Sequence, residues 1–300
     1  MRVISETGGH AGQQPSRRFR WWELLERLSE KLRQHNVALL AGGIAMYGLL
    51  SVFPGLAAAV SIYGLFATPG SVIRHMKVFA GVLPPGVWDI FSAQLNNVAA
   101  HDHGTLTIAA VVGLLFALWS ARLTMSALMT ATNIAYERPE KRGFFFQMLT
   151  SLALTLGVII GFLAMLLLGV IVPLTLAVLG GSPPVDVTVN VLRWALLWGF
   201  AVLGLNIVYY FAPARERGRW HWISWGSAIA ATLWLTVSGL FAFYVRTFSG
   251  YDRTYGALAG VFVLLMWFYL LSLFVILGAE INATLERPWR LPRTAQRRTQ

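Results

Sequence analysis

The sequence predicts an all-α protein that crosses a membrane six times. Hydrophobic residues fill 56% of the 300 positions, charged residues fill only 12%, and the mean hydropathy is +0.61. Long apolar runs with so few charges are typical of polytopic membrane proteins. A net charge of +11 would suggest nucleic acid binding in a soluble chain, but here the basic residues flank apolar runs, so we expect no nucleic acid partner. Cysteine is absent, which excludes thiol nucleophiles and cysteine metal sites.

The chain is expected to begin with a disordered tail, 1–16, and a cytoplasmic amphipathic helix, 17–36. Four apolar residues recur at helical spacing on one side of this helix, namely Trp22, Leu25, Leu28 and Leu32. The helix either lies on the membrane surface or packs against the protein, and the sequence leaves both open. No cleavable leader is expected, because this region has no short apolar run.

The predicted transmembrane domain covers 37–287. Each predicted span exceeds the roughly 20 residues that cross about 30 Å of hydrocarbon. The six spans are Val37–Phe66, Leu106–Tyr136, Met148–Leu179, Val187–Ala212, Trp222–Arg246 and Tyr255–Leu285. The long loop 67–104 holds two amphipathic stretches separated by Pro84-Pro85, which predict short helices on the outer surface or a lid over a cavity.

The distribution of lysine and arginine predicts the orientation. Seven basic residues precede the first span, three lie in 137–147, three lie in 213–221 and five follow Glu286, in a basic tail that includes 288–300. The opposite side carries only five. Because cytoplasmic loops are enriched in lysine and arginine, both termini are expected in the cytoplasm.

One arginine lies inside a predicted span, where a charge is costly. Arg122 is close to mid-depth, and a central arginine costs about 2.5–3.5 kcal/mol on insertion scales. Three further polar residues follow it on the same helical face: Ser126, Thr130 and Asn133. The stripe predicts a water-lined groove or an anion-binding surface. Alternatively, its uncharged members are packing contacts between helices.

The last span ends with Glu280 and Asn282 inside its helical pattern. Glu280 lies about 9 Å from the inner end of its span and Arg122 about 21 Å from the inner end of its own. A direct salt bridge between these two residues is therefore not the default expectation. Glu280 is expected at the inner rim of a polar cavity, or bonded to buried backbone or to Asn282 there.

Proline and glycine predict local features of the spans. Pro54 is expected to bend the first span and free a carbonyl near Leu50. Two small-xxx-small patterns, GVIIG and GALAG, predict close helix contacts within the chain, at Gly157 and Gly161 and at Gly256 and Gly260.

Several motifs resemble the YihY/virulence factor BrkB family of bacterial inner-membrane proteins, once widely labelled ribonuclease BN. The similar segments are SVFPGL, ALWSARLTMSALMTATNIAYERPEKRGFF, YYFAPARERGRWHWISWGSAIAATLW and YDRTYGALAGVFVLLMWFYLLSLFVILGAEINATLER, and the resemblance covers about residues 20–287. It implies a six-span protein of the inner membrane with both termini inside. It implies no chemistry, and the family's links to the cell envelope point toward transport or envelope maintenance.

We therefore expect a transporter or lipid-handling protein whose partners are membrane lipids, with Arg122 contacting an anionic head group. No cofactor, metal site or catalytic residue is expected, and no phosphate-binding loop indicates ATP use. The first alternative is a non-catalytic scaffold that binds an envelope protein. The second is a ribonuclease, for which the only tight cluster of metal-ligand types is His101-Asp102-His103, in a segment predicted outside the cell.

Overall fold

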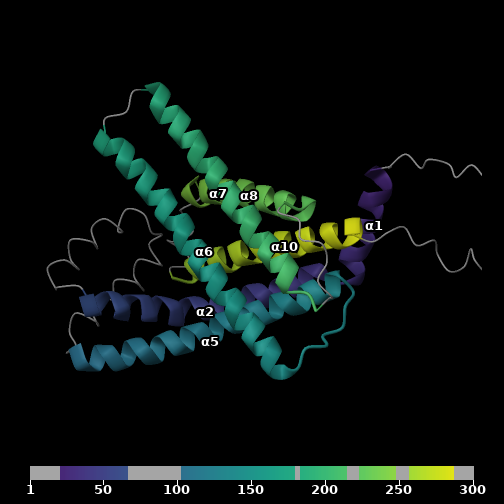
Figure 1. Cartoon of the computed structure of the whole chain (residues 1–300), viewed down its shortest axis with the longest axis horizontal. Coiled ribbons are helices and arrows are strands. Elements are labelled where there is room, and N and C mark those ends of the chain that lie inside the picture. The colour runs from purple at the N-terminus through teal and green to yellow at the C-terminus, as the bar shows by residue number, and fades with distance from the viewer. Residues whose placement is uncertain (1–20, 67–102, 180–182, 215–222, 248–256, 287–300) are drawn as a thin grey trace, which may run out of the picture.

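The computed structural model describes residues 21–66, 103–179, 183–214, 223–247 and 257–286. These residues form helices and no strands (Figure 1). The helices are α1 (Trp21–Gln34), α2 (Val37–Phe66), α5 (His103–Ala135), α6 (Phe144–Leu179), α7 (Pro183–Phe211), α8 (Trp225–Thr247) and α10 (Ala257–Glu286). The tail 1–16, most of the loop 67–104, Gly256 and the tail 288–300 lie outside the described residues, so the predictions made for them stay predictions.

The predicted all-helical class is confirmed for the described chain. Five of its helices are long and apolar enough to cross a membrane: α2, α5, α6, α7 and α10. α8 corresponds to the predicted fifth span, but its apolar stretch is the shorter Trp225–Phe241. Many large apolar side chains of the spanning helices are exposed, as expected where a helix faces lipid.

Two helices begin four residues before their predicted starts. α6 begins at Phe144 rather than Met148, and the amide of Gln147 already donates to the carbonyl of Gly143 at 3.0 Å. α7 begins at Pro183 rather than Val187. Proline is favoured in the first helical turn, where the missing N–H has no helical acceptor to lose. α2 continues through Pro54 as one helix of 30 residues.

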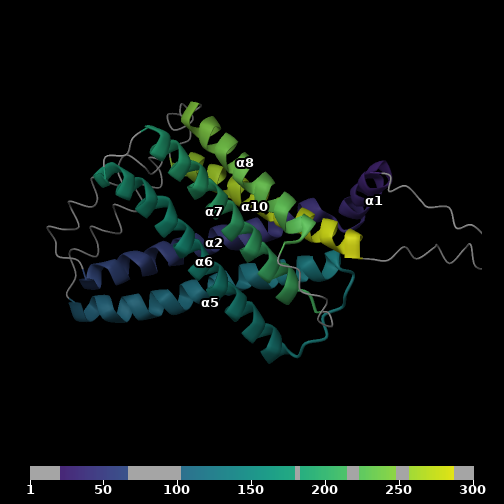
Figure 2. The same cartoon turned by 45° about the horizontal axis from the view of Figure 1, so that its top comes forward.

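α2, α5 and α10 pack together, while α6 and α7 run diagonally across them (Figures 1 and 2). The contact expected from Gly157 and Gly161 is wrong for the described chain, because a Cβ added at either residue would meet nothing within 4 Å. The close helix approach lies instead between α8 and α10.

The six longer helices alternate in direction, so the starts of three lie at the same side of the bundle as the ends of the other three. The starts of α2, α6 and α8 lie toward the right of Figure 1, together with the ends of α5, α7 and α10. Hydrogen bonds join these segments: His35 to Glu280, Ala214 to Asn133 and Gly226 to Asn282. We call this region, comprising those helix ends and the connections 35–36, 136–143, 212–214 and 223–224, the polar end.

α1 meets the bundle at the polar end, where it packs on α2 and α10, and its predicted place on the membrane surface stays a prediction. Its Leu32 packs on a buried cluster that includes Val37 of α2 and Ile276 of α10. Toward its start, Trp22 and Leu25 are 74% and 55% exposed. The second half of the amphipathic face is therefore a packing surface, and the first half is open.

Candidate functional site

Glu280 is the most deeply buried carboxylate of the described chain. Its side chain has no exposure, and its Oε1 lies 2.5 Å from Nδ1 of His35, whose side chain is 15% exposed. His35 stands at the corner between α1 and α2. The next residue, Asn36, turns this corner with a left-handed φ of 49°, and its carbonyl accepts the first amides of α2. We call His35 and Glu280 the buried pair.

An ion pair lies beside the buried pair. Lys31 Nζ is 3.4 Å from Oε1 of Glu137, and both residues act electrostatically on Glu280. Glu137 ends α5 in a Schellman motif, with a φ of 49° and an Arg138 amide that donates to the carbonyl of Asn133 at 2.8 Å. Glycine is usual at this position, so a glutamate here carries a conformational cost.

Two buried oxygens of α10 have no hydrogen-bond partner among the described residues. They are Oε2 of Glu280 and Oγ1 of Thr284. Thr284 follows Glu280 by one turn of α10, so the two side chains share a face. Buried polar atoms are normally hydrogen-bonded, and unpaired ones therefore mark a place for a water, a proton or a ligand.

Asn282 fastens α10 to the start of α8. Its Oδ1 accepts the amide of Gly226 at 2.8 Å, and its Nδ2 donates to Oγ of Ser224 at 2.9 Å. Ser224 is the N-cap of α8, because its Oγ accepts the amide of Ser227 at 3.2 Å. The hydroxyl of Ser224 also donates to Asn206 Oδ1 at 2.7 Å, which links α7. Asn282 therefore has a structural position rather than an open one.

At the same place two glycines let α8 and α10 approach closely. A Cβ on Gly226 would come within 2.0 Å of the carbonyl oxygen of Gly278, and a Cβ on Gly278 within 2.8 Å of Ala230. Tyr209 of α7 adds a hydrogen bond from its hydroxyl to the carbonyl of Val275 at 2.8 Å. Only glycine lets α8 and α10 approach in this way.

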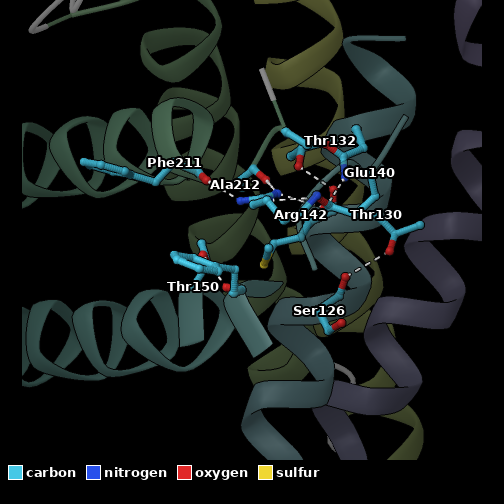
Figure 3. Close-up of polar contacts among 12 residues, drawn as sticks. Ser126, Thr130, Thr132, Glu140, Arg142, Thr150, Phe211 and Ala212 are labelled. Atoms are coloured by element: carbon cyan, nitrogen blue, oxygen red, sulfur yellow. Dashed lines mark hydrogen bonds and ion pairs between the residues drawn. The ribbon is translucent and has the colours of Figure 1, made fainter. Parts of the chain in front are cut away.

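Arg142 joins the ends of α5 and α7 (Figure 3). Its guanidinium donates to both carboxylate oxygens of Glu140 at 2.9 Å and to the carbonyls of Phe211 and Ala212 at 3.2 and 2.6 Å. Asn133 donates to the same carboxylate at 2.9 Å and accepts the amide of Ala214 at 2.6 Å. We call Asn133, Glu140 and Arg142 the Arg142 clamp.

The Arg142 clamp also sets the charge of its carboxylate. Hydrogen bonds from the Arg142 side chain lower the pKa of Glu140 from 4.5 to about 2, against the opposing effect of burial. Glu140 is therefore ionised throughout the physiological range. The predicted polar stripe is therefore not a single functional surface, because Asn133 at its end is a buried structural residue.

Arg122, at the other end of the stripe, has no carboxylate partner among the described residues. It is the twelfth residue of the span Val111–Ala135, and its guanidinium carbon lies 4.7 Å from the centre of the Trp119 ring. Its Nε and Nη1 are buried, and no described residue accepts a hydrogen bond from either. As expected, Arg122 and Glu280 do not pair.

Ser126 and Thr130 lie between Arg122 and the Arg142 clamp. Thr130 donates its hydroxyl to the carbonyl of Ser126 at 3.1 Å, a bond within α5 (Figure 3). Such bonds satisfy a hydroxyl in an apolar environment without a second helix. A role for these two residues in a cavity stays a prediction, and so does the role of Gly260, whose partner in the motif is outside the described residues.

Sequence patterns did not identify His35, Glu140, Arg142 or Ser224. The signal for Ser224 was present, because serine before an apolar helix with a polar residue three positions later indicates a cap. Nothing in the sequence pairs His35 with a residue 245 positions away. Within the described residues, no three His, Cys, Asp or Glu side chains are placed to hold a metal ion, and His101 and Asp102 lie outside those residues.

Comparisons with known proteins match this chain to one family of bacterial membrane proteins. A family described as virulence factor BrkB matches residues 28–300. The ribonuclease-like protein YfkH of Bacillus subtilis is 32% identical over 277 residues, 89% of this chain and 97% of that protein. A UPF0761 membrane protein of Vibrio vulnificus strain YJ016 is 30% identical over 88% of this chain and 83% of its own length. A UPF0761 membrane protein of Cronobacter sakazakii is 26% identical over 87% and 88%, respectively. No solved structure matches.

Proposed function

The chain belongs to the virulence factor BrkB family, as a multi-pass bacterial membrane protein, and on that premise we propose that it translocates an anionic lipid or a similar amphiphile. Arg122 would contact the anionic head group. The proposal assigns no catalysis to the chain, and the ribonuclease-like name belongs to YfkH.

The observation that carries the proposal is the unsatisfied guanidinium of Arg122. A charge near mid-depth requires compensation, and intramembrane ionisable residues commonly mark substrate pathways. Two of its buried nitrogens lack an acceptor among the described residues, although it stacks on Trp119. A phosphate or carboxylate would supply paired acceptors of the geometry that guanidinium prefers.

The surroundings of Arg122 favour a substrate that arrives from the lipid. The adjoining part of α5 exposes large apolar side chains, including Leu115, Phe116 and Trp119. A lipid could bring its head group to the arginine while its chains stay against this surface. A soluble anion would require a route through water, for which the described residues give no direct support.

The orientation with six spans and both termini inside is part of the proposal. α8 has 23 residues, about 35 Å of helix, which exceeds about 30 Å of hydrocarbon. Counting α8, the longer helices alternate in direction, and those that begin at the polar end are α2, α6 and α8. The basic loop 137–147 belongs to the same end, which supports a cytoplasmic location for it.

The test is a lipid-scrambling assay with purified full-length protein in liposomes that contain fluorescent phosphatidylglycerol. Replacing Arg122 with Gln should slow translocation about tenfold, the effect of losing one charge-assisted bond of ~1.5 kcal/mol. The comparison variant is Arg193→Gln, because Arg193 also stacks on a neighbouring tryptophan, at 5.5 Å, and its buried Nε also has no acceptor among the described residues. Arg193 is the seventh residue of the span Val187–Phe211, farther from mid-depth than Arg122, so its replacement should slow translocation less.

Equal rates for wild type and empty liposomes would overturn the proposal. Equal slowing by both arginine variants would remove the specific role of Arg122. The scaffold alternative predicts no flux in any liposome and function that depends on surface segments such as the exposed Trp22 and Leu25 of α1.

A further inference from the structure

The buried pair at the polar end has the geometry of a proton-binding site. Glu280 is wholly buried, His35 retains 15% exposure, and the two side chains are in direct contact at 2.5 Å. Histidine gains and loses a proton near physiological pH more readily than any other side chain. The imidazole therefore connects a carboxylate that has no exposed surface to a group that does.

The carboxylate has an unused acceptor. Oε1 of Glu280 faces the imidazole, while Oε2 is buried and receives no hydrogen bond from any described residue. The hydroxyl of Thr284, one turn along α10, is likewise unpaired among the described residues. One proton can reside on the ring, between ring and carboxylate, or on Oε2.

The charges that face the pair favour uptake of one proton. α1 contributes Lys31 and the end of α5 contributes Glu137, whereas α2 contains no lysine, arginine, aspartate or glutamate. With a neutral imidazole, these groups and Glu280 sum to a net charge of −1. One added proton makes the buried group neutral, which is the state that burial favours.

We propose that His35 and Glu280 form a proton-binding site at the polar end, and that the proton bound there is the coupling ion of the translocation step. The role of the proton as coupling ion rests on the proposed function, whereas the proton-binding site does not. When the proton leaves for the aqueous phase through His35, Glu280 stays as a buried anion beside a neutral ring. The contact that holds the α1–α2 corner to α10 is then weaker, which gives the proton a mechanical effect.

The first measurement tests the site without transport. Infrared difference spectra against pH are recorded on the full-length protein in nanodiscs, for wild type, Glu280→Gln and His35→Gln. In wild type, carboxyl and imidazole bands should change in the same macroscopic step, because the apparent midpoints of coupled groups belong to the pair. Glu280→Gln should remove the carboxyl band and displace the imidazole midpoint by at least about one pH unit.

The matched control is Glu286→Gln, because Glu286 is an exposed carboxylate on the same helix. It should leave both bands in place. The site is disproved if the wild-type carboxyl band survives in Glu280→Gln, or if the imidazole midpoint is the same in both proteins. Glutamine keeps the shape of glutamate and can still bond His35, so these variants are expected to fold.

The second measurement tests coupling, with fluorescent phosphatidylglycerol in liposomes that carry a pH gradient. One pH unit is worth about 1.4 kcal/mol per proton, so a coupled protein should bring the probe to an unequal distribution of up to about tenfold between leaflets. Glu280→Gln should move the probe only to an equal distribution. Movement by wild type that ignores the gradient would overturn coupling and leave the proposed function intact. Linked titration without any probe movement would overturn the proposed function and leave the proton site intact.

Discussion

The contact between Gly226 and Gly278 predicts that Gly226→Ala severely weakens the packing of α8 on α10. The new Cβ would lie 2.0 Å from the carbonyl oxygen of Gly278, whereas ordinary contacts are 3.4–4 Å. This oxygen belongs to a helix backbone, so no side-chain rotation relieves the clash. It would also lie 2.6 Å from the side chain of Asn282, which now accepts the Gly226 amide.

The expected loss follows from these two effects. Overpacking costs about 1–3 kcal/mol, and the hydrogen bond that is broken contributes about 1 kcal/mol, so the free energy of unfolding should fall by about 2–4 kcal/mol. The higher helix propensity of alanine relative to glycine stabilises α8 by less than about 1 kcal/mol. The clash therefore dominates.

The measurement is equilibrium unfolding of the purified protein by SDS in mixed micelles, followed by tryptophan fluorescence. The matched control is Gly239→Ala, also on α8, where an added Cβ meets nothing within 4 Å. The control should be neutral or slightly stabilised. If Gly226→Ala unfolds at the same SDS fraction as Gly239→Ala, the close approach of α8 and α10 described above is refuted.

Two further predictions concern the Arg142 clamp. Arg142→Lys should lower the free energy of unfolding in the same assay by about 1–3 kcal/mol, because an ammonium cannot donate to both oxygens of Glu140 and to two carbonyls at once. The control, Lys141→Arg at an exposed neighbour, should change it by less than about 0.5 kcal/mol. Because the pKa of Glu140 is depressed, the stability it contributes is complete above its ordinary value of 4.5 and is lost as pH falls toward about 2. The difference in melting temperature between wild type and Glu140→Gln should therefore shrink across that interval, and a constant difference would contradict the clamp.

Hydropathy predicted the five spanning helices, because each satisfies its own backbone and is recognised by its length and apolar composition. The boundaries were less well predicted at the starts of α6 and α7. There a phenylalanine run and a proline pair extend the helix beyond its most apolar part. α2 continues through Pro54 as one element, and the bend predicted there stays a prediction.

The site was predicted less completely, for a physical reason. Periodicity defines the face on which Arg122, Ser126 and Asn133 lie, but it does not say which helix is opposite. Asn133 therefore appeared to belong with Arg122, whereas its bonds go to Glu140 and the end of α7. Glu280 was recognised by the cost of burying a carboxylate, and its partner could not be, because a single sequence carries no record of which distant segments meet.

The bonds of the polar end also bear on the order in which the protein is made. The cap of α8 is complete only when Asn282 accepts the Gly226 amide, and His35 meets its carboxylate only when Glu280 is present. Both acceptors belong to α10, which follows every other described helix in the chain. Helices inserted earlier therefore carry unsatisfied polar groups until α10 has been synthesised and inserted. A chain interrupted before α10 would display these groups, and membrane quality control could distinguish it from a finished one.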